Sequence, residues 1–396
     1  REKPSSVAYP ASDFLLTVGG MMLFLLDVAL DVWAVVTFYQ EEAYVFMGLL
    51  VFLLLGSSAL VQVFSWLWYH YDKGSTETKT ESLVKNLHLL KILHVFQMGV
   101  YLRISICGFC SKKRCMEDIA VYLTHDLSLL RLIETFSESA PQLVLMITII
   151  IQRGMVDTGV AASCLSAIAV SVTMYHRSLR SFLPDKAKQG WISSVVYFMW
   201  NLLLIGPRVA AVALFASVFP CFIAVHFLSS WMVLFFVAWQ LKTDFMDSAG
   251  GEWLYRATVG LIWYFSWFSI VEGHTRQRST IYHTWIGVDI GMLCGFWVWQ
   301  MMKNPPYFEL PLDPYVIFVI MILLYIAGLC LKVIYYKFCH PKITKLGEVD
   351  LRLELVGVSQ NGKDEVDFRF MGQTERPEPS VRFNKRMRNL ADNFYS

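Results

Sequence analysis

Long runs of apolar residues, separated by short polar segments, dominate the first 340 positions of the chain. Each run approaches or exceeds the roughly 20 residues that an α-helix needs to cross the hydrocarbon core of a bilayer. The segments that we expect to be helical lie near 14–40, 43–70, 82–108, 119–151, 159–180, 191–218, 219–243, 252–272, 281–302 and 313–338. This pattern predicts an all-α polytopic membrane protein.

Not every one of these segments is expected to cross the membrane. Segment 82–108 carries polar side chains all around its helical wheel, so it is a poor lipid-facing span. If 82–108 and 252–272 are re-entrant and return to the same side, about eight transmembrane helices remain. Most lysines and arginines of the connecting loops then fall on one side, with only Arg153 and Lys303 on the other. The positive-inside rule makes the basic side cytosolic and places both termini there.

The same topology divides the membrane part into two pseudo-repeated halves, each with two spans, a re-entrant segment and two more spans. We expect a first membrane half over 1–180 and a second over 181–340. Repeated halves with broken helices are common in proteins that move a substrate near the membrane midplane. From 341 to 396 the composition becomes polar, with scattered Gly and Pro, which predicts a cytosolic regulatory tail.

Composition narrows the function classes. Of 396 residues 56% are hydrophobic and 17% charged, which excludes an ordinary soluble enzyme. The net charge of +2 gives no overall field for binding nucleic acid, and we expect no nucleic-acid partner. No nucleophile elbow, phosphate loop or dinucleotide fingerprint occurs in its required context, so we expect no enzyme activity, cofactor or metal.

Acidic residues occupy positions where lipid would otherwise be expected. Asp27 and Asp31 lie one helical turn apart in the first predicted helix, and Asp13 lies about 40° away around the same face. A charge at the bilayer centre costs roughly 2.5–3.5 kcal/mol on insertion scales, so this stripe must face protein, water or headgroups.

A second polar stripe lies on segment 119–151, within about 120° of the helix circumference. It consists of Ser128, Arg131, Glu134, Glu138 and Gln142. Further intramembrane charges that could join either stripe are Arg103, Asp126, Arg177, Arg180, Arg208 and Asp289. These groups either lock helices together or form a polar path, and both readings stay open. By contrast, His226 and the tryptophans are expected to be packing or interfacial residues.

The tail contains a short motif of high specificity, formed by Asp364, Glu365, Val366 and Asp367. It is the sequence that an executioner caspase prefers, with cleavage after Asp367. The tail composition predicts an extended, exposed segment, which such cleavage requires. A weaker candidate of the same kind ends at Asp350.

Several motifs spread along the chain resemble the XK-related family of membrane proteins. They are FLLDVALDVW at 24–33, FSWLW at 64–68, LLRLIETFSESAPQL at 129–143, WNLLLIGPRVA at 200–210, EWLYR at 252–256 and NKRM at 384–387. The resemblance covers nearly the whole chain.

The resemblance implies eight transmembrane helices with two partly inserted segments, and energy-independent, bidirectional movement of phosphatidylserine and other phospholipids after caspase cleavage of the tail. It also implies a single-span immunoglobulin-type partner, basigin or neuroplastin, for delivery to the plasma membrane. The family's intramembrane charges fall on Asp13, Asp27, Asp31, Arg103, Asp126, Glu134, Glu138, Arg177, Arg208 and Asp289. One departure is Met174, where close relatives carry an acid that would pair with Arg177.

We therefore expect a phospholipid scramblase that exposes phosphatidylserine at the cell surface during apoptosis. The alternative is a transporter or channel for a small polar solute, for which paired halves and buried charges are equally suitable. A third reading is a structural membrane protein whose charges only lock helices.

Overall fold

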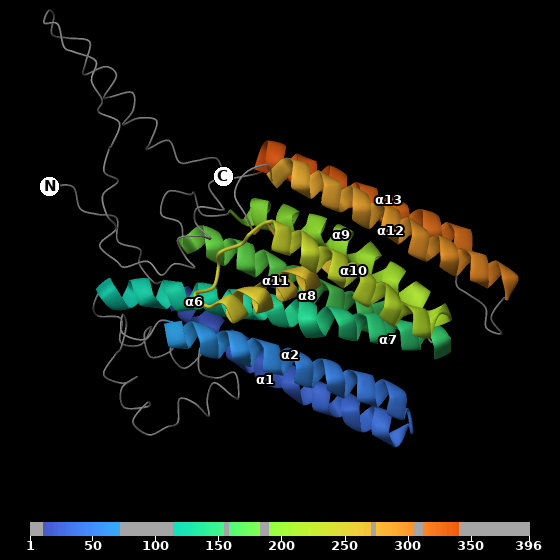
Figure 1. Cartoon of the computed structure of the whole chain (residues 1–396), viewed down its shortest axis with the longest axis horizontal. Coiled ribbons are helices and arrows are strands. Elements are labelled where there is room, and N and C mark those ends of the chain that lie inside the picture. Colours follow the sequence, from blue (N-terminus) through green and yellow to red (C-terminus); the bar gives the residue numbers. More distant parts are fainter. Residues whose placement is uncertain are drawn as a thin grey trace, which may run out of the picture.

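The computed structural model describes residues 11–71, 114–153, 158–182, 190–270, 275–304 and 312–339. Within these ranges every regular element is a helix, and the long helices run side by side along one axis (Figure 1). The all-helical fold class is confirmed. The predicted segment 82–108, Arg103 and the tail with its caspase motifs lie outside the described residues.

The helices follow the predicted segments closely. In chain order they are α1 (Ala11–Gln40), α2 (Tyr44–Tyr71), α6 (Arg114–Glu134), the π-helical turn η1 (Thr135–Ser139), α7 (Ala140–Arg153), α8 (Thr158–Phe182), α9 (Trp191–Val218), α10 (Pro220–Gln240), α11 (Ala249–Phe265), α12 (Thr275–Lys303), α13 (Pro314–Ile334) and the π-helical turn η2 (Tyr335–Cys339). The largest difference is α11, which ends at Phe265 and continues as extended chain, so the helix predicted for 252–272 is shorter than expected.

Four of the described helices are long and apolar enough to cross a membrane: α2, α9, α10 and α13 together with η2. The predicted number of eight crossings and the two repeated halves stay predictions.

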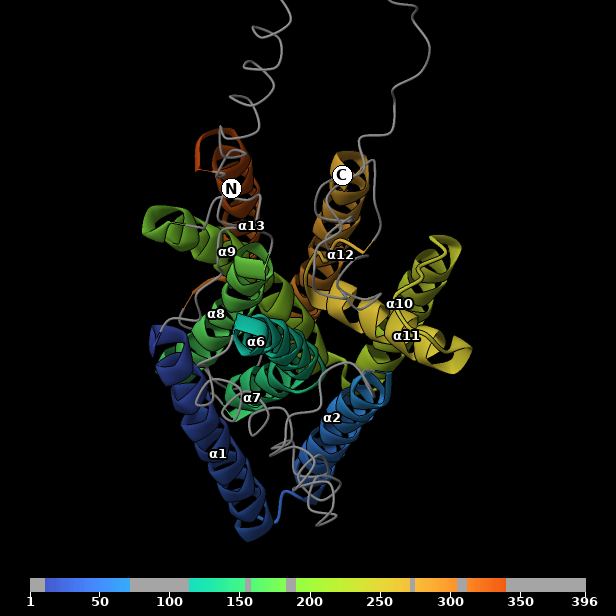
Figure 2. The ribbon, with the colours of Figure 1, turned by 90° about the vertical axis from the view of Figure 1, so that its left-hand side faces the viewer.

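Helix α9 forms the centre of the bundle. It packs against α7, α8, α12 and α13. Of its most apolar 18-residue stretch 67% is buried inside the protein, compared with 17% for α10 and 11% for α13. Figure 2 shows α12 and α13 on one side of this centre, α10 paired with α11 on another, and α1 and α2 on the far side. The outer helices therefore present apolar side chains to lipid while α9 holds the core together.

Local sequence explains several helix ends. Pro314 begins α13 directly after Asp313, whose carboxylate accepts a hydrogen bond from the Tyr315 N–H at 2.8 Å. Ser248 caps α11 in the same way, accepting from the Gly251 N–H at 3.1 Å. Such caps satisfy backbone donors that no helical carbonyl can reach.

Helix α1 is held mainly by its neighbour α2. Phe38, Leu50 and Ile149 form a small separate core that joins α1, α2 and α7. At the end of this hairpin the Arg153 guanidinium forms an ion pair with Glu41 at 2.8 Å. The α1–α2 pair is therefore a flank of the bundle rather than part of its main core.

Candidate functional site

The two polar stripes predicted from the sequence meet between α1 and the α6–η1–α7 segment. Carboxylate oxygens of Asp27, Asp31 and Glu138 all lie within 4.8 Å of one another. The Gln142 Nε2 donates a hydrogen bond to Asp31 Oδ1 at 2.9 Å, which ties α7 to α1. We call Asp27, Asp31 and Glu138 the acid triad.

A π-helical turn positions Glu138 in this triad. The N–H of Ala140 bonds to the carbonyl of Thr135 five residues earlier, and Pro141, which has no N–H, follows directly. The extra residue in the turn shifts the side chains that precede it around the axis. Ser57 of α2 lies 2.8 Å from Ser137 (Oγ to Oγ), so a hydrogen bond between α2 and η1 fixes the turn.

Arg131 and Glu134 sit beside the triad one turn earlier on the same face. The Arg131 Nη1 donates to Glu134 Oε2 at 2.8 Å, and the Arg131 side chain is 27% exposed while the Glu134 side chain is 8% exposed. This arginine is therefore paired within its own helix. Ser128, the first residue of the predicted stripe, bonds to the backbone carbonyl of His125 instead.

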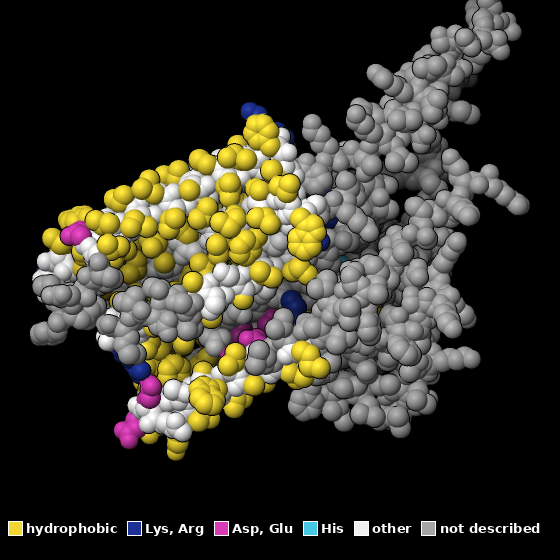
Figure 3. All heavy atoms as spheres, turned by 180° about the vertical axis from the view of Figure 1, so that it is seen from behind, with side chains coloured by type: hydrophobic (Ala, Val, Ile, Leu, Met, Phe, Trp, Pro, Cys, Tyr) yellow, Lys and Arg dark blue, Asp and Glu magenta, His cyan; other side chains and the backbone are white. Residues whose placement is uncertain are grey.

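The triad is open on one side. Asp27 is exposed, whereas Asp31 and Glu138 are only 9% and 8% exposed. Figure 3 shows acidic side chains in a hollow between two bands of hydrophobic side chains on one flank of the molecule. We call the acid triad, together with this hollow, the acid groove.

The acid triad has the donor atoms of a candidate cation site. In the described part of the chain, no basic side chain forms an ion pair with any member of the triad. Three carboxylates this close together repel one another strongly in a medium of low dielectric. A divalent ion or an organic ammonium group could relieve that repulsion, since both prefer carboxylate oxygens.

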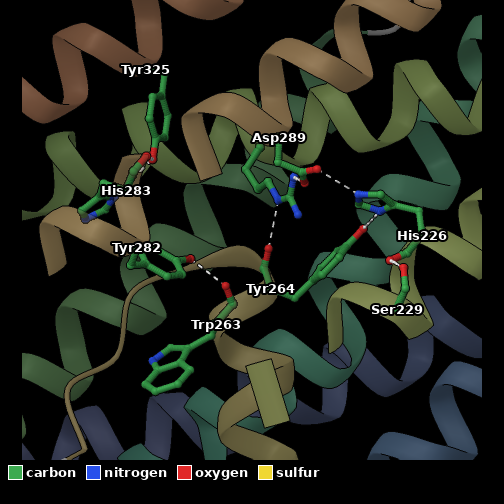
Figure 4. A network of polar contacts seen from close by, with 9 residues as sticks. His226, Ser229, Trp263, Tyr264, Tyr282, His283, Asp289 and Tyr325 are labelled. Carbon is green, nitrogen blue, oxygen red and sulfur yellow. Dashed lines mark hydrogen bonds and ion pairs between the residues drawn. The ribbon is translucent and has the colours of Figure 1, made fainter. Parts of the chain in front are cut away.

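A second group of charges lies in the other half of the bundle and is largely buried. Arg208 of α9 is completely buried and forms an ion pair with Asp289 of α12 through its Nη1. His226 Nε2 of α10 lies 3.1 Å from the other oxygen of Asp289, and His226 Nδ1 lies 3.1 Å from the Tyr264 hydroxyl (Figure 4). We call Arg208, Asp289, His226 and Tyr264 the central lock.

The central lock also closes the inner end of α11. Arg208 donates its Nε–H to the Tyr264 carbonyl at 2.9 Å, and its guanidinium carbon lies 4.6 Å from the centre of the Tyr264 ring. The Tyr282 hydroxyl donates to the neighbouring Trp263 carbonyl at 2.7 Å (Figure 4). A short helix that ends inside a membrane protein needs such partners, because its last carbonyls find no water there.

The sequence analysis considered all these intramembrane charges together, whereas in the structure they belong to separate sites. Asp27, Asp31, Arg131, Glu134 and Glu138 share the acid groove, whereas Arg208 and Asp289 belong to the central lock. Asp126 is buried in α6, and the side chain of Asp13 lies outside the described part.

Met174 stands where an acidic partner of Arg177 was expected, and Arg177 contacts two other side chains. Its Nη1 donates to the Ser194 hydroxyl at 2.6 Å, and its guanidinium lies over the Trp191 ring at 5.4 Å. Met174 itself is 42% exposed.

Two sets of polar residues escaped the sequence analysis. The expectation that His226 is a packing residue was wrong, because it bonds to Asp289 and Tyr264. Lys332 of α13 is buried, and it donates to Ser279 Oγ at 2.8 Å and to His283 Nε2 at 2.7 Å. A lysine near the end of an apolar span resembles an interfacial anchor, so only tertiary packing reveals its burial.

A cavity with room for about one water molecule lies at the inner end of α11. Aromatic side chains line most of it, including Trp200, Trp267 and Tyr282. It is too small for a metabolite or a headgroup, so the acid groove is the candidate site.

Comparison with known proteins agrees with this architecture. The family model described as XK-related protein matches residues 15–341. The chain is 44% identical to XK-related protein 8 of Tetraodon nigroviridis over 100% of this chain and 99% of that protein. It is 46% identical to XK-related protein 8 of Gasterosteus aculeatus over 85% of each chain, and 38% identical to that of Pan troglodytes over 83% of this chain and 84% of the relative. The chain therefore belongs to the XK-related family of membrane proteins.

Proposed function

We propose that this protein is a phospholipid scramblase that exposes phosphatidylserine at the cell surface during apoptosis. The observation that carries the proposal is the acid groove, a row of carboxylates in a hollow on the flank of an apolar helix bundle. A headgroup could move along such a groove while its acyl chains stay in the lipid. The resemblance to the XK-related family points to the same activity.

The physical problem for any scramblase is the cost of bringing a charged headgroup into hydrocarbon. An unpaired polar group in an apolar medium costs several kcal/mol, and an ion costs more. Carboxylates that are already held in the membrane offer partners for the headgroup along its way. Movement then follows the concentration difference between leaflets in both directions, without ATP or a cofactor.

Regulation is proposed to lie in the tail. An executioner caspase would cut after Asp367, within the motif Asp364 to Asp367, or after Asp350. Removal of the segment after the cut would shift the protein from a closed to an open population. The proposal includes a plasma-membrane location, cytosolic termini, and basigin or neuroplastin as the single-span partner.

The alternative is a transporter or channel for a small polar solute. Such a protein needs a path enclosed on all sides, because a dissolved solute cannot pass through lipid. The acid groove is open on the flank of the bundle (Figure 3), and Asp27 of the triad is exposed. A lipid headgroup, whose tails remain in the bilayer, suits an open groove better.

Reconstitution tests the proposal directly. The purified full chain, with its partner, is placed in liposomes that contain fluorescent phosphatidylserine, and inner-leaflet lipid is followed by chemical bleaching from outside. We expect bleaching to pass beyond one half after caspase treatment, and Asp367→Ala to prevent this. If Asp350→Ala prevents it instead, the upstream site is the trigger. If no lipid moves in any condition, the proposed function is wrong.

A further inference from the structure

We infer that Lys332 of α13 and His283 of α12 form a proton-sensitive contact, which holds these two helices together at neutral and higher pH and loosens when the surroundings become acidic. The two side chains belong neither to the acid groove nor to the central lock. The inference does not depend on the proposed function.

The first step is the geometry of the pair. Lys332 Nζ lies 2.7 Å from His283 Nε2, and the two residues are only 9% and 8% exposed. The other imidazole nitrogen, Nδ1, lies 3.1 Å from the Tyr325 hydroxyl, and that hydroxyl donates to the carbonyl of His283 itself (Figure 4). Since the Tyr325 hydrogen is used in this way, His283 Nδ1 carries a proton and Nε2 accepts one from Lys332.

The second step is the charge around the pair. Helices α9 and α12 and the turn η2 pack against α13, and Asp289 is the single acidic residue in these four elements. Its carboxylate is already held by Arg208 and His226 in the central lock. Lys332 forms no ion pair with a carboxylate in the described part of the chain, and its Nζ lies 5.2 Å from the centre of the Trp200 ring.

The remaining ionisable groups near the pair do not supply a negative charge. Tyr325 and Tyr282 contact the His283 side chain and are uncharged at neutral pH. Arg208 of α9 interacts electrostatically with both tyrosines, and Arg180 of α8 interacts in the same way with Tyr335 of η2. The surroundings thus consist of bases and neutral groups, which disfavour an added positive charge.

The third step is the count of protons. With an uncharged amine, the two N–H groups of Lys332 already satisfy Ser279 Oγ and His283 Nε2. A proton on the amine adds a buried charge, which the Trp200 ring offsets only in part. A second proton, on His283 Nε2, removes the acceptor of the hydrogen bond and places two positive charges side by side. Both protons are taken up freely when the contact opens, so acid favours the open contact.

The pair lies at the end of the helix that leads into the predicted tail. Lys332 is in the last turn of α13, and the chain continues through η2 toward the segment predicted to be regulatory. The pH of the surroundings therefore sets how firmly the last helix before the tail is held against α12.

Hydrogen exchange of the purified full chain in detergent tests the inference. Protection of the backbone amides at the end of α13 is measured from about pH 5.5 to about pH 8.5 and corrected for the pH dependence of intrinsic exchange. We expect protection to rise with pH by up to about tenfold per pH unit, the limit for one proton released on closing. Lys332→Met should flatten the profile above neutral pH. His283→Gln keeps an acceptor for Lys332 and should flatten the profile below about pH 6.5, where an exposed imidazole becomes charged.

Lys337 of η2 is exposed, so Lys337→Met is the matched control and should keep the profile of the unmodified protein. Protection that does not change with pH in the unmodified protein would overturn the inference. A profile that survives unchanged in both Lys332→Met and His283→Gln would overturn it as well, because another group would then carry the pH dependence. These readouts involve no lipid movement, so the inference and the proposed function fail independently.

Discussion

Arg208 donates its Nε–H to the backbone carbonyl of Tyr264 at 2.9 Å and thereby joins the central helix α9 to the buried end of α11. The same guanidinium pairs with Asp289 of α12. The Arg208 side chain thus provides a hydrogen-bond donor for a carbonyl at the end of α11 and a counter-charge for the Asp289 carboxylate. Neither group could find a partner in hydrocarbon. The central lock is accordingly a structural device, distinct from the acid groove.

The central lock predicts a specific pattern of stability. Arg208→Met or Asp289→Leu alone should lower stability by about 3–5 kcal/mol, because each leaves an unpaired buried charge. The double variant should recover part of that loss, since both charges are then gone. Thermal unfolding of the purified protein in detergent, followed by fluorescence size-exclusion chromatography, measures this. Single variants as stable as the unmodified protein would show that the buried pair does not hold the helices.

The close approach of α13 to α9 predicts a contrast between two glycines. A Cβ at Gly328 would lie 2.9 Å from Leu204 Cδ2 and 3.1 Å from the backbone carbon of Leu203, whereas nothing lies within 4 Å at Gly291 of α12. Gly328→Ala should therefore destabilise the protein by about 1–3 kcal/mol.

Gly291→Ala is the matched control and should be neutral or stabilising by about 0.5–1 kcal/mol, since alanine favours the helix. Unfolding temperatures of the two variants, measured side by side, give the comparison. A Gly328→Ala protein that unfolds no earlier than Gly291→Ala would contradict the packing described for α9 and α13.

Because the carboxylates of the triad lie close together, we expect a substitution at Asp31 to affect lipid movement and stability in different ways. Asp31→Asn preserves the shape of the side chain that meets Gln142 and removes one negative charge from the triad. Lipid movement should fall about tenfold, whereas the unfolding temperature should stay the same or rise because repulsion is relieved. A parallel fall in unfolding temperature and folded yield would instead assign Asp31 to helix locking.

The sequence predicted the helices well because apolar runs of this length leave few alternatives, and the described helices agree with them within about five residues except at the end of α11 and the start of α12. It also predicted the two polar stripes, at Asp27 and Asp31 and at Glu138 and Gln142, but not that they lie against each other. It could not predict that Arg208 and Asp289 form a separate unit. A helical wheel shows on which face of its helix a charged residue lies, but not which other helix packs against that face. Likewise the burial of Lys332 and the role of His226 follow from how α10, α12 and α13 pack.

The most direct test of lipid movement through an open groove measures lipid and solute together. Liposomes that contain the caspase-treated protein, fluorescent phosphatidylserine in both leaflets and a trapped water-soluble dye are followed simultaneously. We predict that inner-leaflet lipid becomes accessible while the dye is retained, and that Asp31→Asn slows the lipid signal alone. Escape of the dye or another small solute without lipid exposure would contradict the scramblase and favour a solute channel.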